Sequence, residues 1–213
     1  MNRRILALLV ALTAIAGCTA EHEGPAAAVP AVGLTHWRAL ATRDDRRRLR
    51  DWRKSWVKAL GEARPTHRAE VEAAGPLLDP DAALAEPAPP PGDYRCRIVK
   101  LGGQGTSNLR YVGYPFFRCR IEAGPSGTLA FARLDGSQRP VGRIFPDTSR
   151  RMIFLGTLQL GDEVGALRYG HDQARDLAAL VERVGPRRWR LAFPKPHFES
   201  TFDVMELVPA GRG

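Results

Sequence analysis

Several side chains in the sequence are of the types that catalyse hydrolysis, but no motif brings them together. Ser137 and Ser200 are candidate nucleophiles. A serine hydrolase also needs a histidine and an acid beside its nucleophile, and the candidates for these roles are His171, His197, Asp172 and Glu199. The sequence contains no Gly-x-Ser-x-Gly elbow, and Ser137 follows a glycine in a predicted turn. We therefore assign no catalytic residue.

Metal and nucleotide motifs are also absent from the sequence. A metal site could use His171, Asp172 and Asp176, but no His-Glu-x-x-His motif occurs. No cysteine or histidine stands at ligand spacing beside Cys96 or Cys119. The sequence contains neither Gly-x-Gly-x-x-Gly nor a P-loop. We expect no metal and no cofactor.

Arginine gives the strongest remaining signal for ligand binding, because a planar guanidinium can bind phosphate or carboxylate through two hydrogen bonds. Arg95 and Arg97 flank one cysteine, and Arg118 and Arg120 flank another. Side chains alternate between the two faces of a strand. These four arginines are therefore expected to share the face opposite the cysteines.

The direction of this arginine face decides what must offset its charge. An inward face would need Glu182, Glu206 or an anionic ligand, whereas an outward face would need only water and salt. The cysteine face also carries Ile98 and Ile121 and is the more apolar of the two. We expect the cysteine face to be the core.

A second group of polar candidates falls in predicted loops at strand ends, where scaffolds often carry their binding residues. Arg175 stands between two acids, so a structural ion-pair network is an alternative to ligand binding for that residue. Together with the four arginines beside the cysteines, the candidate ligand-binding residues are Gln138, Arg139, Asp172, Arg175 and Asp176.

The elements that would position these residues are mainly short strands. Period-two patterns and turn residues between them predict ten candidate strands. Segment 177–184 is ambiguous, because its apolar spacing also fits a helix. Many short strands at close spacing predict an antiparallel β domain over 92–209, a small barrel or a sandwich. The candidate strands are 93–101, 109–114, 116–122, 127–134, 140–145, 151–160, 163–169, 177–184, 187–194 and 202–208.

Cys96 and Cys119 lie on two of these strands and form an even pair for an oxidising compartment. We predict a disulfide between adjacent antiparallel strands, with a buried free pair as the alternative. Loop-closure entropy gives such a disulfide a stabilisation of about 3 kcal/mol.

A helical segment and a Pro-rich linker precede the strands, over residues 37–91. Thr42 is a predicted N-cap with Asp45 three residues later. Gly61 is expected to end this helix, and Thr66 to begin a second helix that ends at Gly75. An apolar stripe on the first helix either packs on the β domain or contacts a partner, and consists of Leu49, Trp52, Trp56 and Leu60.

The arginine run at 46–53 has two interpretations as well. It could contact an anion or a lipid headgroup, or it could be a solvated face with internal ion pairs, since residues 18–92 carry no net charge.

The N-terminus predicts export and lipidation. Residues 1–17 combine a basic start with a short apolar run, as in a signal peptide. The run Ile15-Ala16-Gly17-Cys18 resembles the lipobox of bacterial lipoproteins, which implies acylation of Cys18 and a membrane anchor. Residues 18–36 would form a flexible tether. The resemblance implies the cell envelope, at the periplasmic face of the outer membrane; ordinary secretion with cleavage after Ala20 is the alternative.

The charge distribution indicates which partners are plausible. The chain carries 32 basic and 23 acidic residues, a net charge of +9. Arg3 and Arg4 of the predicted signal peptide supply +2, and the remaining excess lies after residue 92, where 19 basic and 12 acidic residues give +7. A basic surface attracts anionic lipids, glycans or nucleic acids. No basic run alternates with aromatic residues as in nucleic-acid binders, so we expect no nucleic acid.

From residue 36 onward, several short runs resemble, as a set, an uncharacterised family of bacterial envelope proteins, the domain of unknown function 4893, and the resemblance covers most of the mature chain. The resemblance implies secretion and a single domain, and it implies no activity. The runs are Asp93–Gly102, Gly136–Gly142, Phe154–Thr157, Leu160–Glu163, Tyr169–Asp172, Arg175–Asp176, Glu182–Gly185, Arg188–Leu191, Phe198–Ser200, Asp203–Val204 and Glu206–Pro209.

These observations favour a lipid-anchored, non-catalytic module that binds an anionic small molecule, lipid or glycan. A structural or assembly factor that docks another envelope protein is the first alternative, and an envelope hydrolase is the second. A cavity in the β domain would favour ligand binding, and a filled domain with an exposed apolar patch would favour docking. A cleft joining His171 or His197 to a serine and an acid would favour hydrolysis.

Overall fold

The computed structural model describes residues 36–211, so Cys18, the predicted signal peptide and nearly all of the predicted tether lie outside the described residues. The helical segment consists of α1 (Trp37–Leu40), α2 (Arg43–Arg50), α3 (Trp52–Ala74) and a 3-10 turn, η1 (Gly75–Leu77). The Thr42 hydroxyl accepts a hydrogen bond from the Asp45 amide and caps α2, which confirms the predicted N-cap.

The predicted helix end at Gly61 is wrong. Helix α3 continues through this glycine to Ala74, and its backbone departs from helical geometry at His67. The second helix expected from Thr66 is therefore the part of α3 that follows a kink. Residues 59–63 explain the continuation, because three of the five are buried against the rest of the fold. Packing of this apolar face outweighs the weak helix preference of glycine.

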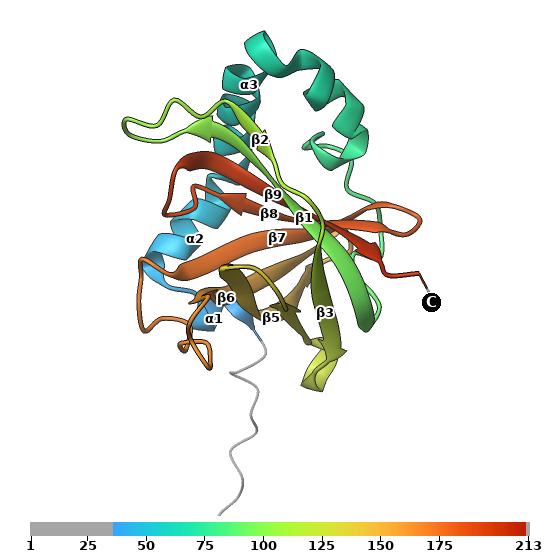
Figure 1. Ribbon diagram of the computed structural model, residues 1–213. Helices are drawn as coiled ribbons and strands as arrows, with labels where there is room; N and C mark the ends of the chain where they lie inside the picture. The colour runs from blue at the N-terminus through green and yellow to red at the C-terminus, as the bar shows by residue number, and fades with distance from the viewer. Residues whose placement is uncertain (1–35, 212–213) are drawn as a thin grey trace, which may run out of the picture. The chain divides into compact units, whose positions relative to one another are not determined.

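Nine strands follow, and eight of them close into an antiparallel barrel (Figure 1). The barrel order is β1-β3-β4-β5-β6-β7-β8-β9, and β9 pairs with β1 to close it. The short β2 pairs with the second half of β1, while β3 pairs with the first half. The strands are β1 (Gly92–Gly103), β2 (Tyr111–Gly113), β3 (Phe117–Ala123), β4 (Leu129–Arg133), β5 (Gln138–Thr148), β6 (Arg151–Leu160), β7 (Asp176–Gly185), β8 (Arg188–Pro194) and β9 (Ser200–Pro209).

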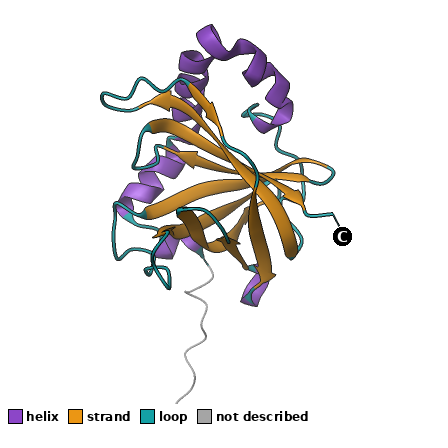
Figure 2. Ribbon diagram, in the orientation of Figure 1, coloured by secondary structure: helices purple, strands orange, loops and turns teal. Residues whose placement is uncertain are grey.

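The fold class predicted from the sequence is confirmed: the chain is mainly β, with a helical segment before the barrel (Figure 2). The ambiguous segment 177–184 is strand β7. The predicted strand at 163–169 is wrong, because residues 161–175 form the loop between β6 and β7. The β6–β7 ladder ends at the pair Thr157–Asp176, so the loop has no neighbouring strand to pair with. Val164 in this loop is fully exposed.

Two apolar cores lie on opposite faces of the barrel wall. Inward side chains such as Cys119, Phe131 and Leu191 fill the barrel interior. Outward side chains of one side of the wall pack against the helices, which run along the barrel in Figure 1. The Trp56 ring lies 4.6 Å from the Phe202 ring and is fully buried. The apolar stripe therefore packs on the barrel, and the alternative that Trp56 contacts a partner is wrong.

A buried arginine joins the helical segment to the barrel. Arg190 projects outward from β8 and binds the Glu182 carboxylate of β7 at 2.7 Å. Its guanidinium also donates to the backbone carbonyls of Pro76, Leu77 and Asp79, at the end of the helical segment. Both charged side chains are at least 96% buried. This clamp satisfies the carbonyls of a turn that would otherwise be buried without partners.

Two glycines let β5 and β6 approach closely inside the barrel. Gly142 and Gly156 lie opposite each other, and the Phe154 ring covers both. A Cβ added at Gly142 would lie 2.3 Å from the Leu155 carbonyl oxygen and 2.5 Å from the Gly156 Cα. Backbone atoms cannot yield to such a contact, so this position requires glycine.

Candidate functional site

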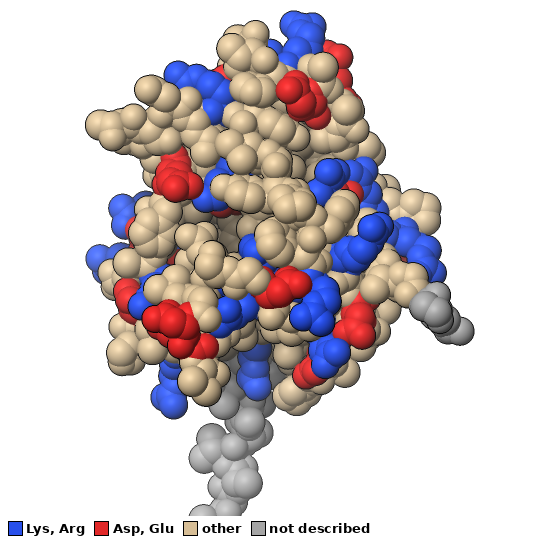
Figure 3. Space-filling view, viewed as in Figure 1, with Lys and Arg blue, Asp and Glu red and all other residues tan. Residues whose placement is uncertain are grey.

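One end of the barrel carries the longer loops and holds the candidate site. The loops 104–110, 134–137, 161–175 and 195–199 all lie at this end, which we call the open end. Two adjoining recesses at the open end share Ile98, Lys100 and Gln138. The inner recess measures about 60 Å³ and the outer recess about 310 Å³. The face drawn in Figure 3 is hollowed near its middle, with charged side chains close to the hollow.

The inner recess is largely apolar. Leu158, Leu177 and Phe193 line it together with Ile98. Its volume of about 60 Å³ is well below the roughly 150 Å³ of an engineered cavity that binds benzene. Below it, aromatic and aliphatic side chains fill the barrel. The barrel therefore has room for a small group at its open end and none for a large ligand in its centre.

Lys100 projects from β1 into both recesses. Its ammonium lies 2.8 Å from the Glu199 carboxylate in the β8–β9 loop. Asp203 is its cross-strand neighbour on β9. Burial lowers the pKa of Lys100, but the hydrogen bond to Glu199 and the charge of Asp203 outweigh it and raise the pKa above its ordinary value.

Asp203 is a carboxyl of the open end whose pKa is shifted in favour of its neutral form. Burial raises the pKa of its carboxyl to about 6, although a hydrogen bond from the Ser200 hydroxyl and the charge of Lys100 both lower it. The Asp203 carboxylate therefore changes charge in mildly acidic solution, directly beside the Lys100 ammonium.

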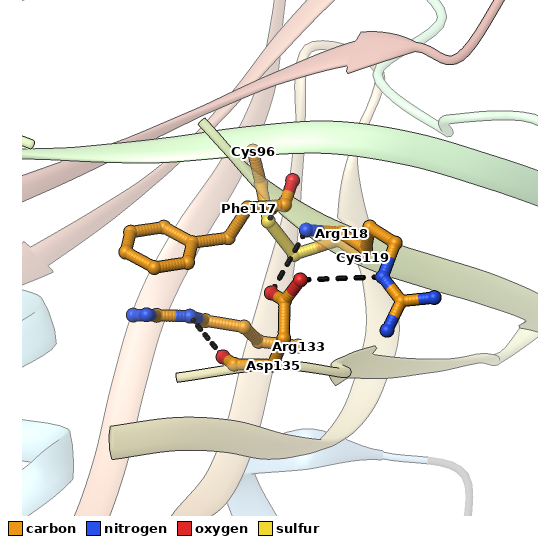
Figure 4. Close-up of a disulfide and its surroundings, with 6 residues drawn as sticks. All are labelled: Cys96, Phe117, Arg118, Cys119, Arg133 and Asp135. Carbon is orange, nitrogen blue, oxygen red and sulfur yellow. Dashed lines mark hydrogen bonds and ion pairs between the residues drawn. A yellow bond between two sulfur atoms is a disulfide. The ribbon is translucent and has the colours of Figure 1, made fainter. Parts of the chain in front are cut away.

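Arg133 is the unusual cation of the site. It ends β4 on the inward face and lines the outer recess. Its guanidinium lies 3.5 Å from the centre of the Phe117 ring, and its Nε donates to the Asp135 carbonyl at 2.9 Å (Figure 4). Burial lowers the pKa of Arg133. Its two terminal nitrogens make no hydrogen bond to any residue of the described range 36–211.

Arg133 differs in this respect from the other buried cations among the described residues. Arg48, Lys100 and Arg190 each lie within 4.0 Å of a carboxylate. Arg133 is 8% exposed and has no such partner in the part of the chain that the structure describes. A buried guanidinium without a carboxylate is costly unless an anion or water reaches it. The geometry thus offers an anion two free donors inside a recess.

The loop that carries Glu199 is held in an unfavourable backbone conformation. Lys195 and Glu199 both have positive φ, at 45° and 61°. Non-glycine residues adopt this left-handed region at a cost of about 1 kcal/mol or more, and such residues concentrate at functional sites. The conformation brings the Glu199 carboxylate over Lys100, so this loop closes one side of the open end.

The cysteines pair as the sequence predicts. Their sulfur atoms lie at bonding distance, and the Cα atoms of Cys96 and Cys119 are 5.9 Å apart on the adjacent strands β1 and β3 (Figure 4). The bond runs diagonally, because Cys96 lies opposite Phe117 and Cys119 lies opposite Tyr94. Both cysteines are buried in the barrel interior, so the cysteine face is the core, as expected.

The four arginines beside the cysteines point outward. Arg95 packs over the Phe116 ring at 4.8 Å. The other three are ion-paired at the surface, in the pairs Arg97–Glu206 at 2.6 Å, Arg118–Asp135 at 3.2 Å and Arg120–Asp93 at 2.8 Å. The arginine face therefore points outward, which was one of the two alternatives. Protein carboxylates, and not a ligand, offset most of its positive charge.

The loop candidates separate into one residue at the site and four in structural roles. Gln138 lines both recesses. Arg139 donates to the backbone carbonyls of Gly136 and Leu160 and holds two loops together. Asp176 is buried and accepts a hydrogen bond from the Gly170 amide.

The remaining two loop candidates form the ion-pair network that was the alternative to ligand binding. Arg175 binds the carboxylates of Glu163 and Asp172 within the β6–β7 loop. This network orders the loop and leaves none of its members lining the recesses of the open end.

The residues considered for hydrolysis do not assemble into a triad. The Ser200 hydroxyl donates to the Asp203 carboxylate, and His197 lines the inner recess. Within residues 36–211, no hydrogen bond connects a histidine to Ser137 or Ser200. The same residues contain no group of three or more His, Cys, Asp or Glu side chains that could hold a metal ion.

Three residues of the site, Lys100, Arg133 and Asp203, are absent from the candidates predicted from the sequence. The alternation of side chains along a strand places each of them on the inward face of its strand. Lys100 lies on the face of Cys96, Arg133 on the face of Phe131, and Asp203 two residues before a buried methionine. A charged residue at the end of an apolar strand face is the pattern that could have identified them.

Comparisons with known proteins identify a family without an assigned function. A family model described as a domain of unknown function (DUF4893) matches residues 37–207. No curated protein and no solved structure matches the chain. Within the described residues, no helix is long and apolar enough to cross a membrane.

Proposed function

The chain belongs to the DUF4893 family, and we propose that it is an envelope protein that binds a small anionic molecule at the open end of its barrel. The observation that carries the proposal is Arg133, a buried guanidinium that faces a recess and has no carboxylate partner among the described residues. An anionic group in the outer recess would accept hydrogen bonds from its free nitrogens.

The two recesses suggest which kind of anion fits. The outer recess, at about 310 Å³, lies at the lower limit of small-molecule sites. Lys100 and Gln138 line it together with Arg133 and can contribute further donors. The apolar inner recess would take a short alkyl end of the ligand. A carboxylate with a short aliphatic tail fits both recesses, whereas a glycan or a complete lipid chain exceeds their volume.

Binding of butyrate tests this proposal, with butanol as the neutral ligand of the same chain length. Calorimetric titration of the purified protein should detect butyrate and fail to detect butanol. Arg133→Gln should weaken butyrate binding by about tenfold or more, because a charged hydrogen bond contributes about 1.5–3 kcal/mol. Arg118→Gln is the matched control, since this arginine lies on the outer face, and it should change affinity less than twofold.

Two results would contradict the proposal. One is equal binding of butyrate and butanol, which would remove any role for the charge. The other is an equal loss of affinity in both arginine variants. Circular dichroism of each variant separates loss of the site from loss of the fold, and Arg133→Lys, which keeps the charge, should retain part of the affinity.

The envelope location in this proposal is supported by the sequence Ile15-Ala16-Gly17-Cys18 and by the buried disulfide, which suits an oxidising compartment. Cys18→Ser should release the protein from membranes into the soluble fraction. A protein that stays membrane-bound after this substitution, with its signal removed, would refute acylation as the anchor.

A further inference from the structure

A third recess lies between the helices and the barrel wall, away from the open end. It is formed by α1, α2, the start of α3 and the β5–β6 turn, and it measures about 480 Å³. We propose that this recess binds a phosphate group. The residues that line it are Trp37, Arg38, Arg46, Leu49, Arg50, Trp52, Asp147, Thr148, Arg151 and Ile153.

The charge of this phosphate recess is strongly unbalanced. Four guanidiniums line it, from Arg38, Arg46, Arg50 and Arg151, and Asp147 supplies the only carboxylate among the lining residues. That carboxylate is already occupied. It accepts a hydrogen bond from the Trp37 indole at 2.9 Å, and it lies 3.2 Å from Arg38 and 3.8 Å from Arg151.

The other two guanidiniums, those of Arg46 and Arg50, have no carboxylate within hydrogen-bond distance in the part of the chain that the structure describes. Arg46 donates only to backbone carbonyls, those of Arg38 and Ala41. The nearest carboxylate of Arg50 belongs to Asp51, at 3.9 Å. These two arginines stand four residues apart on α2, so their side chains lie on one face of the helix. Two neighbouring guanidiniums on one helix face can bind one anion from the same side.

Aromatic rings hold the remaining two arginines in place. The Arg38 guanidinium lies 4.3 Å from the centre of the Trp37 ring, and that of Arg151 lies 5.7 Å from the centre of the Trp52 ring. The Arg151 Nε is buried and makes no hydrogen bond within the described residues, and its nearest acceptor is the Asp147 carboxylate at 3.8 Å. A buried donor without a hydrogen bond is rare in proteins, so this nitrogen can accept a closer partner. It adds to the excess of positive charge as a sign of a ligand at the recess.

The chemistry of the recess selects phosphate over a simple carboxylate. A phosphate monoester carries a charge near −2 and three acceptor oxygens at neutral pH. Four guanidiniums with one shared carboxylate leave an excess of three positive charges, which a single carboxylate would offset poorly. Guanidinium forks match phosphate oxygens in pairs. The phosphate could belong to a soluble molecule or to a lipid headgroup, and binding experiments distinguish these two sources.

The experiment uses the full chain with Cys18→Ser, so that an acyl anchor does not obscure membrane binding. Calorimetric titration with glycerol 1-phosphate is the first measurement, and sedimentation with vesicles that contain phosphatidic acid, a lipid phosphomonoester, is the second. The test variant is Arg46→Gln combined with Arg50→Gln. The control is Arg43→Gln combined with Arg47→Gln, which removes the same charge from the same helix outside the recess.

The proposal expects glycerol 1-phosphate to bind the parent protein and the control pair with similar affinity, and the test pair about tenfold or more weakly. If the protein sediments with phosphatidic acid vesicles, and free glycerol 1-phosphate reverses this binding, the site belongs to the phosphomonoester headgroup of a lipid. Binding of glycerol 1-phosphate without vesicle binding would assign it to soluble phosphates. Failure to bind either probe, or an equal loss in both pairs of variants, would overturn the proposal.

This result is separable from the proposal for the open end. Arg133→Gln should leave binding of glycerol 1-phosphate unchanged, and the α2 variants should leave butyrate binding unchanged.

Discussion

Replacing Asp203 by asparagine should stabilise the protein at pH 8 and have little effect on stability at pH 4. The reason is the raised pKa of this carboxyl, which burial at the open end moves to about 6. Between its ordinary pKa of about 4 and this raised value, the folded protein binds a proton that the unfolded chain releases. Asparagine keeps a similar shape and has no proton to lose.

The magnitude follows from the shift in pKa. A carboxyl whose folded-state pKa is raised contributes stability that is fully present below its unfolded pKa and is lost as pH rises through its folded pKa. A shift of about two units corresponds to about 3 kcal/mol. Most of this difference develops between pH 4 and pH 8, so the stability gained by Asp203→Asn should grow by about 2–3 kcal/mol over that range.

The assay is urea-induced unfolding of the parent protein and the variant at pH 4, 5, 6, 7 and 8. Asp162→Asn is the matched control, because it makes the same substitution at an aspartate that lies exposed in the β6–β7 loop. A constant difference between Asp203→Asn and the parent across this range would refute the reasoning. So would a variant that becomes less stable as the pH rises.

Three further predictions concern the fold. Arg190→Met should lower the free energy of unfolding by about 3–5 kcal/mol, because it leaves Glu182 buried without a cation. Adding Glu182→Leu should restore much of this stability, and a double variant as unstable as Arg190→Met would contradict this account of the clamp. Replacing both disulfide cysteines by serine should cost about 3 kcal/mol in chemical denaturation, and an unchanged midpoint would argue against the pairing. Gly142→Ala should destabilise the barrel by about 1–3 kcal/mol in thermal unfolding, whereas Gly165→Ala, where a Cβ meets nothing within 4 Å, should be neutral.

Much of the fold could be predicted because strand alternation and turn residues are local signals. Burial of Cys96 and Ile121 on one face follows directly from period two. The strand at 163–169 could not be excluded in this way, because its lack of a partner depends on where the β6–β7 ladder ends. The continuation of α3 through Gly61 depends on packing against the barrel, which local propensity does not record.

The candidate site was harder to predict, because its residues are far apart in the sequence. Lys100, Arg133 and Asp203 lie on three strands, and closure of the barrel brings them to the same end. Most of the residues that the sequence predicted as ligand-binding were chosen because other charged residues lie close to them in the sequence. Arg139 and Arg175 mark loops that are held together, and dense local charge in this chain indicates internal ion pairs more often than a binding site.

The Arg190 clamp has a consequence for how the molecule opens. Helix α3 and η1 cannot separate from the barrel without exposing Glu182 and three backbone carbonyls that share one guanidinium. Partial unfolding of the helical segment alone would break this clamp and expose the apolar core beneath the helices, so we expect the segment and the barrel to unfold together. Amide hydrogen exchange should report similar protection in α3 and in β8, with both regions exchanging through a single cooperative event. Proteases should then find few sites within the helical segment while the barrel remains intact.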